Sequence, residues 1–285
     1  VSLSLRFPGR TLFEYAEEVM GRVLGKAVGL LYIWWFLHTS ALIMDEFASF
    51  LCIAFMPDTP HPIFFIVGIA VAGYAVRNGL EVLSRYNQLF LPLVLGLLLI
   101  VFILLAKDMK VARLLPVYDA GLVPIVKGAA VPASWLGEIV TFSMIIPYLD
   151  KPKEAYRVAS LSTLATGAFL MISILVALLT LGPNLPGLWI FSIYNAVRVV
   201  SIANFLERLE SIIVAVWMFG GFAKIGVFYY AAVLGSAQWL GLRDYRPLVA
   251  PVGVTLVGLA LLCQNIVDLL DFASRAWPPY ALIVF

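Results

Sequence analysis

The stretch "ESIIVAVWMFGGFAKIGVFYYAAVLGSAQWLGLR", residues 210–243, contains one charged residue, Lys224, between its two ends. A helix rises about 1.5 Å per residue and the hydrocarbon core of a bilayer is about 30 Å thick, so roughly 20 apolar residues are enough to cross it. The whole chain of 285 residues is 62% hydrophobic and 13% charged. That composition excludes an ordinary soluble domain and predicts an integral, multi-pass, all-α membrane protein.

Apolar runs of spanning length recur along the chain. We expect a single transmembrane domain over residues 1–285, in which residues 1–26 form a cytoplasmic loop and an amphipathic helix (11–26) lying on the membrane surface. About seven full spans follow, and an eighth begins near Trp277. The expected spans are 27–56, 61–77, 86–106, 131–149, 155–181, 205–240 and 247–264.

The connections between the spans predict an orientation. With residues 1–26 on the cytoplasmic side, that side holds eleven Lys and Arg residues and the opposite side holds seven, Lys224 left out. Because short cytoplasmic loops carry an excess of Lys and Arg, this count favours a cytoplasmic first loop. Two long apolar connections, 107–130 and 182–204, are expected to form short helices across the outer face.

Lys224 lies near the middle of its span, where an ionisable group costs roughly 2.5 to 3.5 kcal/mol. One interpretation is that Gly220 and Gly221 break the helix and let the lysine side chain reach an interface. The alternative is an ammonium that faces a cavity and either holds an anionic ligand or replaces a bound cation.

A second candidate for a ligand site is "PASWLGEIVTFSMIIPYLDKP", residues 132–152, in which Glu138 is embedded among apolar residues. Pro132, Gly137 and Pro147 disfavour a continuous helix. An interrupted span can offer unpaired backbone groups to a small ligand. The alternative is a proline kink with Glu138 paired to a neighbouring helix.

Other polar residues within the spans have structural as well as functional interpretations. His38 could be a hydrogen-bonded core histidine or a proton relay, and Asp45 could pair with a basic group of another helix. In "NFLERLES", Glu207, Arg208 and Glu210 either begin a helix, where acidic residues are favoured, or form a gate or intersubunit ion pair.

Several classes of site are not indicated. The net charge is only +2 and is spread along the chain, so the sequence does not indicate a basic surface that would bind nucleic acid. Cys52 and Cys263 lie in apolar runs, so we expect no disulfide and no metal site. The chain has two histidines and no catalytic motif, so we expect no enzymatic activity and no cofactor.

Four stretches carry a resemblance to a known family: "FPGRTLFEYAEEVMGRVLGKAVGLLY" (7–32), "LLPVYDAGLVPIVKGA" (114–129), "IIPYLDKPKEAYRVAS" (145–160) and "FLERLESIIVAVWMFGGFAKIGVFYYAA" (205–232). They resemble the B subunit of bacterial spore nutrient germinant receptors, within the amino acid, polyamine and organocation transporter superfamily. The resemblance implies a leucine-transporter-like fold of ten helices in two inverted repeats. On that template the chain would hold helices three to nine, lacking helices one and two and most of helix ten.

The resemblance also implies a ligand site at the midplane, between interrupted helices one and six and walls from helices three and eight. Ala223 on helix eight would join that wall, and Lys224 beside it would act as a cation surrogate or coupling group. The remaining implied ligand-binding residues are Trp35, His38, Thr39, Ser134, Trp135, Leu136, Gly137 and Glu138.

The function implied by the resemblance is that of a nutrient-sensing subunit in the inner spore membrane or cell membrane. It would bind a small molecule such as an amino acid and act with A and C subunits. The alternative is a proton-coupled amino acid transporter of the same superfamily.

Overall fold

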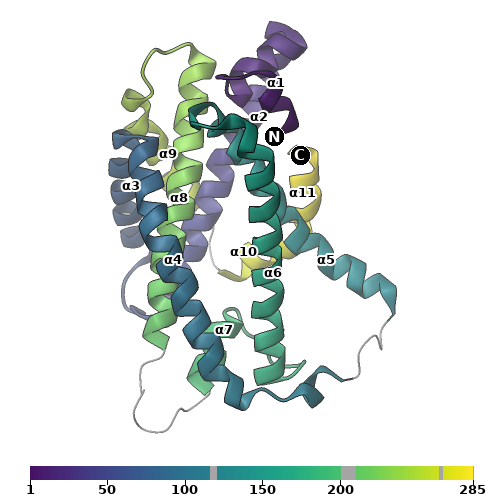
Figure 1. Cartoon of the computed structure of the whole chain (residues 1–285). Helices are drawn as coiled ribbons and strands as arrows, with labels where there is room; N and C mark the ends of the chain where they lie inside the picture. The colour runs from purple at the N-terminus through teal and green to yellow at the C-terminus, as the bar shows by residue number, and fades with distance from the viewer. Residues whose placement is uncertain (116–120, 200–209, 263–265, 285) are drawn as a thin grey trace.

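A computed structural model of the chain describes residues 1–115, 121–199, 210–262 and 266–284, and within these ranges every regular element is a helix (Figure 1). Among these described residues, six helices are long and apolar enough to cross a membrane. The predicted multi-pass, all-helical membrane protein is therefore confirmed. The main helices are α1 (Ser2–Arg6), α2 (Leu12–Ala54), α3 (His61–Asn78), α4 (Leu80–Leu105), α5 (Leu122–Leu136), α6 (Ala155–Leu181), α7 (Ser192–Val199), α8 (Glu210–Leu240), α9 (Val249–Ala260), α10 (Ile266–Asp271) and α11 (Trp277–Val284).

Short turns of other helix types join these elements. Two short 3-10 helices, Ala106–Asp108 and Val111–Leu114, follow α4. A 3-10 helix, η3 (Gly137–Met144), continues directly from α5, and a shorter one, Ile146–Tyr148, comes next. A π-helical turn, η7 (Phe272–Ala276), links α10 to α11. The remaining 3-10 helices are Pro152–Glu154 before α6 and Arg246–Leu248 before α9.

The centre of the molecule is an antiparallel pair formed by α2 and α8. At one end of the pair, the Thr11 Oγ1 hydroxyl donates to Gln238 Oε1 at 2.7 Å. At the other end, the rings of Phe50 and Trp217 stack with centroids 4.6 Å apart. Between them, a Cβ atom at Gly221 would lie 2.6 Å from Phe47 Cδ2, so the glycine allows the two helices to approach closely.

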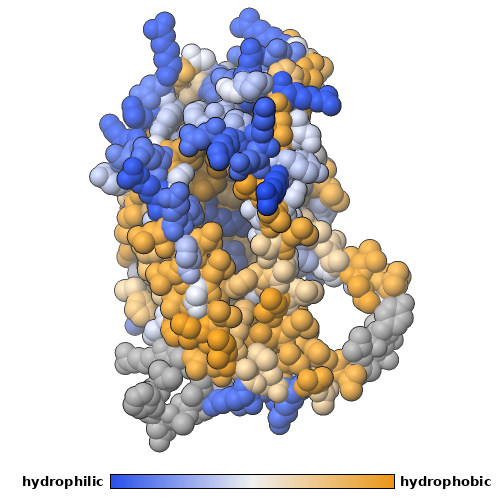
Figure 2. All heavy atoms as spheres, viewed as in Figure 1, coloured by the Kyte–Doolittle hydropathy of each residue, from blue (hydrophilic) through white to orange (hydrophobic). Residues whose placement is uncertain are grey.

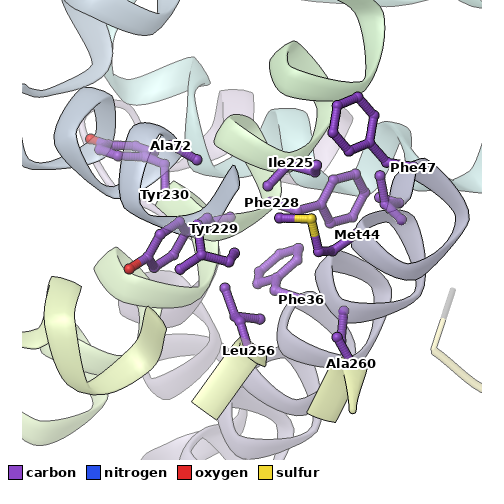
Figure 3. Packing of buried hydrophobic residues seen from close by; sticks show 14 of the residues in the cluster. Phe36, Met44, Phe47, Ala72, Ile225, Phe228, Tyr229, Tyr230, Leu256 and Ala260 are labelled. Carbon is purple, nitrogen blue, oxygen red and sulfur yellow. The ribbon is translucent and has the colours of Figure 1, made fainter. Parts of the chain in front are cut away.

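Around this pair, α3, α4 and α9 complete an apolar core. Figure 3 shows Phe36, Met44 and Phe228 in contact range within it, with Leu256 of α9 beside them. Phe36, Met44 and Leu256 are fully buried, which is the arrangement expected of close-packed helices whose small and large side chains interdigitate.

The structure corrects four predicted boundaries. The helix predicted for residues 11–26 breaks at Gly21, whose φ of 79° and ψ of 166° interrupt α2, and does not run unbroken to residue 26. A glycine accepts that positive φ at little cost. The second span after α2 begins at Leu80 instead of 86, because Gly79 alone (φ 101°) connects α3 to α4. The span expected at 131–149 begins at Leu122 and ends at Met144, so residues 122–130 are part of it and not part of a connection.

The fourth correction concerns the seventh span. In the described part of the segment expected to cross at 247–264, the helix covers Arg246–Ala260, which is short for a bilayer. The helix break expected at Gly220 and Gly221 is also wrong, because α8 continues through both residues.

The two ends of the bundle differ in polarity. Figure 2 shows hydrophilic side chains gathered over the end that carries α1 and the N-terminus, with a broad apolar surface below it. The start of α2 and the end of α8 meet at this end, as does the α3–α4 connection, where the Tyr245 hydroxyl donates to the Val76 carbonyl at 3.2 Å. Toward the opposite end, the short helix α7 lies between the lower parts of α4 and α6 in Figure 1.

Candidate functional site

Lys224 lies in the middle of α8. It is 14 residues from Glu210 and 16 from Leu240, the two ends of the helix, which places it roughly 21 and 24 Å from them. Because the helix is continuous, its ammonium cannot reach either interface through a break. Its charge therefore has to be compensated within the apolar part of the molecule.

Glu138 provides that compensation. Lys224 Nζ lies 2.9 Å from Glu138 Oε2 and 3.2 Å from Glu138 Oε1, so both carboxylate oxygens accept from one ammonium. The carboxylate side chain is 14% exposed and the lysine side chain 44%. This confirms the interpretation in which Glu138 pairs with a neighbouring helix.

The position of Glu138 follows from a change of helix type. At Gly137 the α-helix α5 gives way to the 3-10 helix η3, and Glu138 falls in the first turn of the new helix. A 3-10 helix has three residues per turn in place of 3.6, so the change alters the direction in which the following side chains point. The predicted interruption of this span is a change of helical geometry and not a gap.

The ion pair lines a cavity of about 310 Å³. The cavity is bounded by α2, the α5–η3 junction, α8 and the segment from α10 to α11. Its polar lining includes Thr39, Glu46, Glu138 and Lys224, and its apolar and aromatic lining consists of Leu42, Ile43, Trp135, Ile190, Leu269, Leu270, Phe272, Ala273 and Trp277.

Two polar atoms in the cavity lining are buried without a hydrogen-bond partner. They are Thr39 Oγ1 and Trp277 Nε1, in side chains that are 1% and 4% exposed. A buried polar atom without a partner costs free energy, and both atoms are closed off from the cavity by their neighbours. The cavity thus offers the Lys224 ammonium and the carboxylates of Glu46 and Glu138 to a small ligand.

Glu46 is the site residue that sequence reasoning missed. It lies two helical turns after Thr39 on α2, so both side chains share one face of the helix. It also lines a second cavity of about 320 Å³, bounded by α4, α6, α7 and α8. Glu46 and Ile190 line both cavities, so the carboxylate lies at the boundary between them.

Of the predicted ligand-binding residues, the cavity brings together Thr39, Trp135 and Glu138, and the coupling residue Lys224. The others lie near it but do not line it. Trp35 is fully buried behind Trp277, with ring centroids 4.8 Å apart. Leu136, Gly137 and Ala223 are neighbours of lining residues in the chain without lining the cavity themselves.

His38 and Ser134 have local hydrogen-bond partners. His38 Nδ1 lies 3.2 Å from the Tyr280 hydroxyl, and the imidazole stacks on Trp34. The Ser134 hydroxyl donates to the Val131 carbonyl within its own helix at 2.6 Å. The geometry of His38 matches the interpretation of a hydrogen-bonded core histidine.

The predicted gate lies mostly outside the described residues. Glu207 and Arg208 fall there, and Glu210 is the first residue of α8. Within residues 210–262 and the other described ranges, Glu210 has no ion pair, and no group of three or more His, Cys, Asp or Glu side chains could hold a metal ion.

Comparison with known proteins gives a consistent set of relatives. The profile of a family described as "Spore germination protein" matches residues 1–267. Spore germination protein KB of Bacillus subtilis (strain 168) is 25% identical over 284 residues, which cover 98% of this chain and 76% of that protein. Spore germination protein A2 of the same organism is 28% identical over 256 residues, covering 88% of this chain and 69% of that protein. Spore germination protein YndE, also of that organism, is 23% identical over 272 residues, 92% of this chain and 72% of that protein. No solved structure matches.

Proposed function

The chain belongs to the spore germination protein family, and on that premise we propose that it is the nutrient-sensing membrane subunit of a germinant receptor. In this proposal a small molecule such as an amino acid binds in the cavity beside the Lys224–Glu138 pair. The role is one of binding and signalling without catalysis. The receptor would have two arrangements, and the ligand would shift the equilibrium toward the one that it binds more tightly.

The observation that carries the proposal is the composition of the cavity. An amino acid has a carboxylate and an ammonium close together, and the cavity presents both kinds of partner within about 310 Å³. Lys224 can donate to a carboxylate, and Glu46 can accept from an ammonium. Apolar residues such as Leu42, with the aromatic Phe272, would contact the ligand's side chain.

We also propose that residues 1–285 form one transmembrane domain with a leucine-transporter-like inverted-repeat arrangement. In that arrangement α2 would be helix three, α5 with η3 would be helix six, and α8 would be helix eight. The change from α to 3-10 helix at Gly137 supports this assignment, since helix six of that fold is the interrupted one.

The proposed partners follow from the family. The chain is an integral multi-pass membrane protein, and we propose that it lies in the inner spore membrane and signals together with A and C subunits. Glu207, Arg208 and Glu210 remain candidates for contacts with such a subunit.

A thermal-shift screen of the purified full-length protein against amino acids, sugars and nucleosides tests the proposal. We expect at least one amino acid to raise the melting temperature in a concentration-dependent way, because a ligand that binds only the folded state stabilises it by mass action. If all three classes of compound leave the melting temperature unchanged, the sensing role is wrong.

The ion pair also favours a second candidate, a proton-coupled amino acid transporter. A Lys–Glu pair within the spans could exchange a proton between its members during a transport cycle. Uptake of a labelled amino acid into proteoliposomes, driven by a pH gradient and absent without one, would favour the transporter. Binding without uptake would favour the sensor.

A further inference from the structure

A groove of about 470 Å³ lies between α3 and α9, away from the candidate ligand site. Its walls are mainly apolar and include Ile66, Ala70, Val254 and Val257. Ala70 and Val254 are exposed, so the groove opens toward the outside of the bundle at the level of the apolar surface. In a multi-pass membrane protein, lipid is the medium that meets this surface.

Two glycines that line the groove let the Tyr229 side chain pack closely between α3 and α9. A Cβ atom at Gly253 would lie 2.4 Å from the Tyr229 hydroxyl oxygen, and one at Gly73 would lie 3.3 Å from it. The Tyr229 hydroxyl donates to the Val249 carbonyl at 2.5 Å, so it needs no further partner. The polar group at the floor of the groove, the Tyr229 hydroxyl, therefore already has its hydrogen bond, and an apolar chain can lie over it without leaving that group unpaired.

The groove has a basic end. Arg77 lines it, and within the described residues its exposed guanidinium has neither an ion pair nor a hydrogen bond. Arg246 lies beside it, because its Nε–H donates to the Arg77 carbonyl at 3.2 Å. The nearest opposing charge that contacts this pair is Asp244, whose carboxylate accepts the Arg246 backbone N–H at 3.1 Å. Two guanidiniums against one carboxylate leave a net positive charge.

We propose that this groove binds an anionic phospholipid. One acyl chain lies between α3 and α9 over Gly73 and Gly253, and the phosphate is held by Arg77 and Arg246. Guanidiniums are suited to this role because their planar set of donors pairs with two phosphate oxygens at once. Arg77 lies next to the α3–α4 connection at the hydrophilic end, and the rest of the groove lining is mainly apolar, so a phosphate and an acyl chain would each meet a matching part of the groove.

Neighbouring basic residues do not offer the same site. Arg85, at the same end of the bundle, pairs with Glu81 at 2.6 Å, so its charge is already compensated. This makes Arg85 a matched control for Arg77, because both are exposed arginines close to the α3–α4 connection.

The test is native mass spectrometry of the full-length protein, released from detergent after titration with phosphatidylglycerol or phosphatidylcholine of the same acyl composition. We expect phosphatidylglycerol to be retained preferentially. Arg77→Gln and Arg246→Gln should each lower its retention about fivefold, since a basic residue near an anionic lipid surface is worth about 1 kcal/mol. Arg85→Gln should leave it unchanged. Equal retention of the two lipids, or an equal loss in R85Q, would overturn the proposal.

A second pair of variants tests the acyl chain. Ala70→Phe fills the groove from α3, and we expect it to lower phosphatidylglycerol retention several-fold while R77 and R246 stay in place. Ile63→Phe adds the same ring to an exposed position of α3 outside the groove and should have no effect. If A70F retains the lipid as well as I63F does, the acyl chain does not lie in this groove and the assignment is wrong.

Discussion

Lys224 and Glu138 differ in how exposed their side chains are within the fold, and this sets what each substitution does. Glu138 is 14% exposed and Lys224 is 44% exposed. Removing the lysine leaves a nearly buried carboxylate without a counter-charge, which is costly. Replacing both Lys224 and Glu138 by apolar side chains leaves no unpaired charge, so the cost is avoided.

For the residue scale we therefore predict that Lys224→Met lowers the free energy of unfolding by about 2 kcal/mol. The double variant Lys224→Met, Glu138→Leu should recover most of that loss. Lys151→Met serves as the control, because Lys151 pairs with Glu154 at 3.6 Å on an exposed surface, and such pairs contribute about 1 kcal/mol or less. Unfolding in detergent micelles measures all three. If the double variant is no more stable than K224M, the unpaired Glu138 carboxylate is not the cause of the lost stability.

Sequence reasoning found these two residues separately and could not join them. Each is an isolated ionisable group in an apolar run, which is a strong signal in a membrane protein. They are 86 positions apart, and only the packing of η3 against α8 brings them together. Glu46 was missed although its spacing from Thr39 puts both on one face of α2, since only Asp45 beside it was considered as a partner for a charge. Burial in the fold distinguishes them: Asp45 is 1% exposed and does not line the cavity.

At the scale of elements, the contact between α2 and α8 depends on one glycine of an adjacent pair. A Cβ atom at Gly221 would lie 2.6 Å from Phe47, whereas one at Gly220 would meet nothing within 4 Å.

We predict that Gly221→Ala destabilises the protein by about 1 to 3 kcal/mol through overpacking. Gly220→Ala should not destabilise it, and alanine's better helix propensity could add up to about 1 kcal/mol. The difference in melting temperature between the two variants is the measurement. Equal melting temperatures would contradict the close α2–α8 approach.

Element boundaries were harder to predict than element types, for reasons visible in particular residues. The prediction put 122–130 in a connection with short helices. Pro124 falls in the first turn of α5, where a proline's missing N–H costs little, so the spanning helix can begin at Leu122. The predicted span begins at residue 86, after Glu81 and Arg85. They pair at i and i+4 on exposed turns of α4, so their charges are compatible with the helix.

At the scale of the whole molecule, the charged end of the bundle carries the N-terminus and the α8–α9 connection, and the opposite end carries the α2–α3 connection. The excess of Lys and Arg predicts that the charged end faces the cytoplasm.

We expect a single cysteine at Arg243 to react with a membrane-impermeant maleimide only after permeabilisation of the cells, with Cys52 and Cys263 replaced by serine. A cysteine at Asp58, in the α2–α3 connection, should react in intact cells. The reversed pattern would contradict the orientation. Reaction of both in intact cells would contradict the placement of the two connections on opposite sides.

The central claim is that the cavity beside Lys224 and Glu138 binds the nutrient. Ala273 lines this cavity and Ser274, the next residue, is exposed and does not line it. They therefore provide a blocking position and a matched control one residue apart.

The most direct measurement is equilibrium binding of whichever amino acid gives the largest thermal shift, to the unmodified protein, Ala273→Trp and Ser274→Trp. The account predicts that the tryptophan at 273 fills the cavity and weakens binding at least tenfold, while the one at 274 leaves it unchanged. Equal affinity in A273W and S274W would contradict the claim and place the ligand elsewhere.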